Sequence, residues 1–160
     1  MRAAALHAAV IARAAGVTVS FDLNFRPALW SAAAALEAID AMLPLADIVL
    51  PSLDEAEALT GLTDEAAILD RFGRGRARIV ILKCGADGAR LATDGGVSVI
   101  PAHPVVAVDS SGAGDSFAGA FLAHYLETGD PLLAAEAAAR VAAATVTGWG
   151  ATDSIPRRAG

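Results

Sequence analysis

Short apolar segments that contain β-branched residues alternate along the chain with longer, alanine-rich segments. The apolar segments predict strands that begin near Val17, Ala46, Arg78 and Val105. Helices are expected between most of these strands, and a hairpin is expected over residues 89–100, around the pair Gly95-Gly96. This alternation of strands and helices predicts an α/β fold around a largely parallel sheet.

The two ends of the chain both predict helices. The segment that opens with Met1-Arg2 resembles an amphipathic helix closed by Gly16. The last helix, expected at Pro131–Thr147, has apolar residues on all sides and should be packed between layers. With 160 residues, a net charge of −6 and a pI near 4.9, residues 1–160 are expected to form a single domain.

Composition excludes several classes of protein. The 12 lysines and arginines are scattered, so no nucleic-acid-binding face is expected. Glu136 and Arg140 interrupt the most alanine-rich stretch, and no apolar segment is long enough to predict a membrane span. Cys84 is the only cysteine, which indicates a reducing, cytoplasmic location. The three histidines have a spacing that suggests neither a metal site nor a catalytic triad.

The run from Asp109 to Phe117 carries the strongest chemical signal in the sequence. It follows the strand expected at Val105–Val108 and contains Gly112 and Gly114, which allow the backbone to approach a ligand closely. A helix is expected to begin near Gly114. Its free N–H groups and its dipole would favour an anion, such as the transferring phosphoryl group of ATP.

Two better-known glycine motifs do not fit this run. Gly114 and Gly119 have the separation of a P-loop, but Ala120 and Phe121 follow them instead of lysine and serine or threonine. The dinucleotide fingerprint needs its third glycine at the position of Phe117. A dinucleotide-binding oxidoreductase is therefore the least favoured class of function.

Asp115 lies inside the expected cluster of N–H donors. A carboxylate there repels a bound anion, but it suits a base that takes a proton from an attacking hydroxyl. The alternative interpretation is a glycine-rich turn that Asp115 merely caps.

Residues Asp109–Phe117 resemble the second signature of the ribokinase-like (PfkB) carbohydrate kinases, D-T-T-G-A-G-D-S-F, with serines for both threonines. The resemblance implies a three-layer ribokinase-like fold. It also implies an anion hole formed by Gly112, Ala113 and Gly114. Asp115 would be the catalytic base. It further implies a monovalent-cation site, with K⁺ as the candidate ion, formed by Asp109, Ser111, Gly150 and Ser154.

A second group of polar residues follows the first expected strand. Pro27 keeps Arg26 out of helical geometry, so Asp22, Asn24 and Arg26 should project from the carboxyl end of that strand. Arg26 could bind a carboxylate or a phosphate, or it could form a loop salt bridge with Asp22. The pattern D-x-N-x-R-x-x-L-W resembles the loop of 2-keto-3-deoxygluconate kinases and bacterial fructokinases, which implies substrate binding by Asn24 and Arg26.

Two further motifs point to the nucleotide. Glu55 matches the glutamate of the family's N-x-x-E motif, which implies a role in organising Mg²⁺, although Ser52 replaces the asparagine. Lys83, Gly85 and Gly88 match K-x-G-x-x-G, which borders the ATP pocket in the resembled family. Lys83 could instead be a strand-end lysine that extends to solvent.

The resemblance covers nearly the whole chain, yet it corresponds to the carboxyl-terminal half of a kinase about twice as long. The fold is therefore expected to be incomplete, without the amino-terminal half and its lid, and inactive by itself. Exposed strand edges and a mean hydropathy of +0.51 predict an interface. The full-length form would be a homo-oligomer.

The expected function is ATP-dependent phosphorylation of a small-molecule sugar acid, most like that of a 2-keto-3-deoxygluconate kinase. Two alternatives stay open. One is a fructokinase or another neutral-sugar or nucleoside kinase of the same family. The other is a truncated, non-catalytic module that binds a nucleotide.

Overall fold

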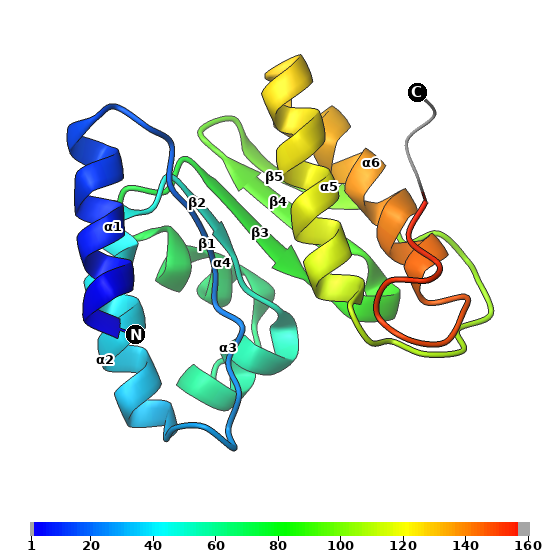
Figure 1. The fold of residues 1–160 in the computed structure, drawn as a ribbon, viewed down its shortest axis with the longest axis horizontal. Coiled ribbons are helices and arrows are strands. Elements are labelled where there is room, and N and C mark those ends of the chain that lie inside the picture. The colour runs from blue at the N-terminus through cyan, green and yellow to red at the C-terminus, as the bar shows by residue number, and fades with distance from the viewer. Residues whose placement is uncertain (1, 157–160) are drawn as a thin grey trace. The chain divides into compact units, whose positions relative to one another are not determined.

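The computed structural model describes residues 2–156 and contains helices and strands in alternation (Figure 1). In the part of the chain described, the elements in chain order are α1 (Arg2–Ala14), β1 (Ser20–Asp22), α2 (Ala32–Met42), the 3-10 turn η1 (Leu43–Leu45), β2 (Ile48–Leu50), α3 (Leu53–Thr60), α4 (Glu65–Gly73), β3 (Ile79–Lys83), the 3-10 turn η2 (Gly85–Asp87), β4 (Ala89–Thr93), β5 (Gly96–Ile100), α5 (Ala113–Thr128) and α6 (Pro131–Thr145). The chain divides into two units. The first is Met1–Lys83 with Ala92–Val97, and the second is Cys84–Leu91 with Ser98–Gly160.

The strands follow the order β1-β2-β3-β4-β5. The first three are parallel, with Ser20 opposite Ile48 and Ile48 opposite Ile79. Strands β4 and β5 are joined by only Asp94 and Gly95, a connection that permits antiparallel pairing alone. The expected α/β fold is confirmed, and its sheet is mixed because of this hairpin.

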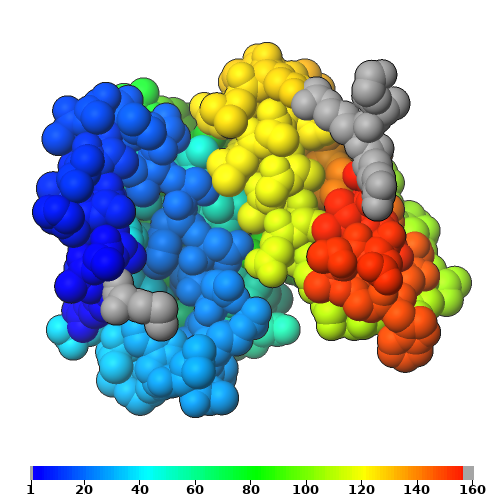
Figure 2. Space-filling model, viewed as in Figure 1, coloured from blue at the N-terminus to red at the C-terminus, as the bar shows by residue number. Residues whose placement is uncertain are grey.

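The core of the first unit is formed by the central strands and the helices of that unit. All three residues of β2 are buried, as are the first four of β3, which is typical of strands covered on both faces. Helix α4 packs on β3 and contributes Ile68 and Phe72, both fully buried. By contrast, α1 exposes Val10 and Ile11, and it lies at the surface in Figure 2, coloured dark blue.

In the second unit, α5 and α6 pack against each other. Phe117 and Phe121 are buried from α5, and α6 contributes five buried alanines, whose small side chains permit a close approach of the two helices. The side chain of Asp130 caps α6, with Pro131 at its first position. The helix expected at the carboxyl end is thus confirmed, but it is not buried on all sides, because Leu132 and Leu133 are exposed.

The strand expected at Val105–Val108 is not formed. The segment has no regular structure, and Val105, Val106 and Val108 are exposed. Its end is held instead by single hydrogen bonds, in which the N–H groups of Val108 and Asp109 donate to the carbonyl of Val146. β-Branched residues favour extended backbone, but a strand also needs a neighbouring strand, and within residues 2–156 this segment bonds instead to the carbonyl of Val146, the C-cap of α6.

Asp47 joins three parts of the first unit. Its carboxylate accepts a hydrogen bond from Val19 N–H at 3.0 Å and one from Arg76 Nε at 2.9 Å, and it lies 3.7 Å from Arg13. Burial alone would raise the pKa of Asp47, but the Val19 N–H and the two arginines outweigh it and lower the pKa. The stabilisation is therefore complete above the ordinary carboxyl pKa and is lost as the pH falls below it.

We expect Asp47→Asn to reduce the free energy of unfolding by about 1–2 kcal/mol at pH 7, because an amide cannot pair with the arginines. The difference from wild type should shrink below pH ~4, where the unfolded carboxyl is protonated. Urea denaturation at pH 7 and pH 3 measures both values. Asp94→Asn, in the exposed hairpin turn, is the control and should not change the free energy of unfolding at either pH. An equal loss of stability at pH 7 and pH 3 in Asp47→Asn would contradict the role of the Asp47 charge.

Candidate functional site

The loop after β1 presents two of the expected substrate-binding residues. Burial alternates along it: Leu23 and Phe25 are buried, whereas Asn24 and Arg26 are exposed. Asn24 has a positive φ of 44°, and its N–H donates to Asp22 Oδ1 at 3.2 Å. The buried side chains therefore anchor the loop while the polar ones face outward, as the sequence predicts.

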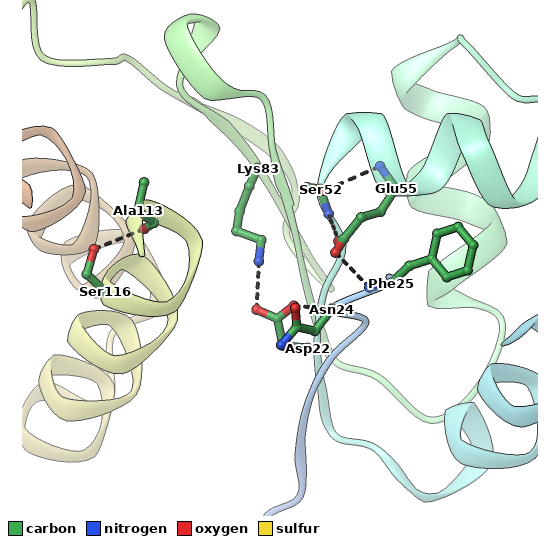
Figure 3. Close-up of polar contacts among 8 residues, drawn as sticks. All are labelled: Asp22, Asn24, Phe25, Ser52, Glu55, Lys83, Ala113 and Ser116. Carbon is green, nitrogen blue, oxygen red and sulfur yellow. Dashed lines mark hydrogen bonds and ion pairs between the residues drawn. The ribbon is translucent and has the colours of Figure 1, made fainter. Parts of the chain in front are cut away.

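Asp22 forms an ion pair with Lys83 and not with Arg26. Lys83 Nζ, at the end of β3, lies 2.6 Å from Asp22 Oδ2, and the two side chains are 13% and 24% exposed (Figure 3). Burial raises the pKa of Asp22 and the charge of Glu55 adds to the rise, which the ammonium of Lys83 only partly offsets. The predicted salt bridge between Arg26 and Asp22 is thus wrong. The alternative in which the Lys83 side chain extends into solvent is wrong as well. The ATP-side role of Lys83 stays a prediction.

Glu55 binds backbone amides through both of its carboxylate oxygens. Oε2 accepts from Ser52 N–H at 3.1 Å, and Ser52 Oγ accepts from Glu55 N–H at 3.4 Å, which forms a capping box at the start of α3. Oε1 accepts from Phe25 N–H at 2.8 Å (Figure 3). The motif spacing indicated a residue for Mg²⁺, and only the folded chain shows these contacts with Phe25 and Ser52.

The glycine-rich run of the second unit forms the start of α5. Gly112, at φ 76°, is the N-cap, and the helix begins at Ala113. Ala113 N–H donates to Ser110 O at 3.2 Å, so it is not one of the free amides that the sequence predicts. Among residues 2–156, no acceptor is recorded for the N–H groups of Gly114 and Asp115.

Gly114 and Asp115 are exposed, and α5 reaches the surface on the face drawn in Figure 2, coloured yellow-green to yellow. In the part of the chain that the structure describes, no side chain caps α5, so the interpretation of Asp115 as a mere cap is wrong. Instead, Ser116 Oγ donates to Ala113 O at 3.0 Å within the first turn (Figure 3). Two free amides and one exposed carboxylate therefore lie at the positive end of a 16-residue helix.

The residues expected at a monovalent-cation site come from two segments of the second unit that lie together. Asp109 Oδ1 accepts from Ser111 N–H and Asp109 Oδ2 from Gly150 N–H, both at 2.9 Å. The Ser111 amide, assisted by that of Gly150, lowers the pKa of Asp109, which keeps it ionised. Ser154 packs on Gly148, where an added Cβ would lie 1.9 Å from Ser154 Oγ. Cation binding by this group stays a prediction.

Gly85 and Gly88 shape the turn η2 that follows β3. Cys84 N–H donates to Gly88 O at 2.8 Å, and Gly88 has a φ of 80°. A Cβ at Gly88 would lie 2.1 Å from the carbonyl oxygen of Ile100, so only glycine fits there. This packing accounts for Gly88 structurally, and contact of either glycine with ATP stays a prediction.

Comparison with known proteins identifies the family of this fold. The model of the pfkB family carbohydrate kinases matches residues 1–158. The chain belongs to this family. Its relatives include the 2-dehydro-3-deoxygluconokinase of Thermoproteus tenax, 32% identical over 86% of this chain and 43% of the relative, and the probable fructokinase-5 of Arabidopsis thaliana, 38% identical over 76% of this chain and 38% of the relative.

Solved structures agree with the pfkB assignment. The aminoimidazole riboside kinase of Salmonella enterica, complexed with aminoimidazole riboside and an ATP analogue, superposes with a TM-score of 0.87 at 32% identity, over 94% of this chain and 53% of that one. A putative ribokinase II of E. coli superposes with a TM-score of 0.84 at 30% identity, over 94% and 49%. The ribokinase-like fold is confirmed, and the chain spans about half the length of the relatives that it matches. Within residues 2–156, no helix is long and apolar enough to cross a membrane.

In this pfkB chain, Lys83→Met should lower the free energy of unfolding by about 2 kcal/mol at pH 7, because it leaves the Asp22 carboxylate covered and unpaired. The loss should shrink as the pH falls towards 4, since a carboxyl with a raised pKa is more readily neutralised in the folded state. Urea denaturation at several pH values measures this. The double variant Asp22→Asn/Lys83→Met should recover part of the loss, and a double variant as unstable as the sum of its singles would refute the pairing.

Gly112→Ala should destabilise the chain by about 1–3 kcal/mol, because alanine is strained at a positive φ. The new Cβ would also lie 2.7 Å from the carbonyl oxygen of Ala151. Gly119→Ala is the matched control: it lies in the same helix with open space around it, and it should stabilise slightly. Thermal unfolding compares the two variants, and equal midpoints would show that the α5 start tolerates a side chain.

Proposed function

We propose that this chain forms the phosphoryl-transfer part of an ATP-dependent sugar kinase whose acceptor is 2-keto-3-deoxygluconate. The observation that carries the proposal is the start of α5, where two free amides accompany the exposed carboxylate of Asp115. Relatives from Thermoproteus tenax, Bacillus subtilis and Escherichia coli that are named 2-dehydro-3-deoxygluconokinase support this acceptor. So does Arg26, whose exposed guanidinium suits the carboxylate of a sugar acid.

In the proposed reaction, the oxygen of a sugar hydroxyl attacks the γ-phosphorus of ATP. The new O–P bond forms as the bond between that phosphorus and the β–γ bridging oxygen breaks, which releases ADP. Asp115 accepts the proton of the hydroxyl. The N–H groups of Gly114 and Asp115 stabilise the negative charge on the transferring group, while Ala113 shapes the turn through Ser110.

Mg²⁺ would supply positive charge at the phosphates. The described residues contain no group of three acidic, histidine or cysteine side chains that could hold an ion by themselves. Both oxygens of Glu55 already accept amide hydrogens, although each keeps a second lone pair. This donor set fits an ion held mainly by water and phosphate, which Glu55 would reach through water.

A fructokinase is the second candidate. The fructokinase of Klebsiella pneumoniae is 38% identical over 73% of this chain, and the fructokinase of Vibrio cholerae, solved with fructose, ADP and calcium, superposes with a TM-score of 0.85. Coupled detection of ADP with 2-keto-3-deoxygluconate and with fructose separates the two. Because the chain spans half of its relatives' length, the assay is run with the chain alone and with the amino-terminal half of a relative added. If neither sugar causes ADP to be released, the result would favour the non-catalytic module.

Asp115→Asn should reduce turnover by about 100-fold or more, because the base is lost. Binding of a non-hydrolysable ATP analogue, measured by calorimetry, should be unchanged or tighter, since a negative charge is removed beside the phosphates. Glu136→Gln, which removes an acid from α6 of the same unit, is the control and should alter neither value. Near-normal turnover in the Asp115 variant would overturn the assignment of the base.

A further inference from the structure

We propose that Glu55 is a positioning residue that acts through the backbone: its carboxylate holds the loop with Asn24 and Arg26 in place by binding Phe25 N–H. This inference rests on the proposed function, because that function gives Asn24 and Arg26 their substrate. It assigns to Glu55 a task that is independent of any metal ion.

The need for such a contact follows from where β1 ends. The last pair of the β1–β2 ladder is Asp22 opposite Leu50, so the amides beyond it have no strand partner. Phe25 is nevertheless buried, with 6% of its surface exposed, and a buried N–H without an acceptor is costly. Glu55 Oε1, at 2.8 Å, supplies that acceptor from a residue 30 positions away.

The position of Phe25 makes this one hydrogen bond decisive for the loop. Phe25 lies between Asn24 and Arg26, and burial alternates along these residues: Phe25 is buried and both of its neighbours are exposed. A shift or rotation at the Phe25 amide would therefore move both polar side chains together. The charge of the acceptor strengthens the bond relative to one with a neutral acceptor.

The carboxylate also serves a second amide at the same time. Oε2 accepts from Ser52 N–H, directly after β2, so Glu55 joins the loops that follow two adjacent parallel strands. Two N–H donors require two acceptors. A glutamine of the same shape has only one acceptor oxygen. Its NH2 group would point at the N–H of either Phe25 or Ser52, and two donors cannot form a hydrogen bond with each other.

The test compares Glu55→Gln with Asp54→Asn. Both variants remove one negative charge from the first turn of α3 and leave the size of the side chain unchanged. Asp54, however, is exposed, and it accepts no hydrogen bond from residues 2–156. Any effect of the helix dipole is therefore shared by the two. The first readout is the hydrogen-exchange rate of individual backbone amides, measured by NMR with EDTA present and without nucleotide or sugar.

In Glu55→Gln, we expect the Phe25 or Ser52 amide to exchange about tenfold faster or more, the change that loss of one charge-assisted hydrogen bond predicts. Asp54→Asn should leave both rates unchanged. The second readout is kinetic: in the assay with the added amino-terminal half, Glu55→Gln should raise the KM for the sugar several-fold more than the KM for Mg·ATP.

The outcomes separate this inference from the proposed function. Wild-type exchange at both amides in Glu55→Gln, or a KM increase confined to Mg·ATP, would overturn the positioning role. If the wild-type protein phosphorylates neither sugar, the proposed function fails. Faster exchange of the Phe25 amide in Glu55→Gln, measured in EDTA, would then still support the role of Glu55 in holding the loop.

Discussion

The parallel pairing of β1, β2 and β3 is the constraint on which the first unit's candidate site depends. Parallel strands end at the same edge of a sheet, and the register places Asp22 opposite Leu50, one strand away from β3. A further bridge pairs Ser52 with Lys83 beyond the regular ladder. Asp22, Ser52 and Lys83 therefore meet at one edge, although they are far apart in the sequence, and this edge is where open α/β sheets bind their ligands.

The carboxylates of the candidate residues in the two units differ in what they bind. Asp22 forms an ion pair with Lys83. Glu55 and Asp109 each accept hydrogen bonds from two backbone amides in separate loops. These three groups hold loops in place. In the part of the chain described, the exposed side chain of Asp115 makes no hydrogen bond or ion pair, in contrast to these three carboxylates.

In both units, a carboxylate accepts hydrogen bonds from two backbone amides of the loops around it. The Phe25 and Ser52 amides have acceptors in Glu55, and the Ser111 and Gly150 amides have theirs in Asp109. The free donors at Gly114 and Asp115 are exposed, where water or an anion can satisfy them. A site for a phosphoryl group requires this contrast, because amides already bonded within the protein cannot bind a ligand.

Sequence by itself determined the features that depend on neighbouring residues. The alternation of strands and helices, the hairpin around Gly95 and the helix after Gly112 all follow from local backbone preferences, and the structure has each of them. The signature at Asp109–Phe117 led to the correct family for the same reason, since its spacing reflects one local geometry. The exposure of Asn24 and Arg26 was also expected from the sequence, because both are polar and follow the carboxyl end of the first strand.

Only the tertiary structure decided which groups pair across long distances. Lys83 bonds to Asp22 over 61 residues, Glu55 to Phe25 over 30 and Gly150 to Asp109 over 41, and no local pattern encodes these partners. The segment 105–108 shows the same limit, because its β-branched residues favour a strand, but within residues 2–156 it pairs with no strand. Local propensity depends on the residue and its neighbours, whereas a hydrogen bond or ion pair depends on what the rest of the chain brings within reach.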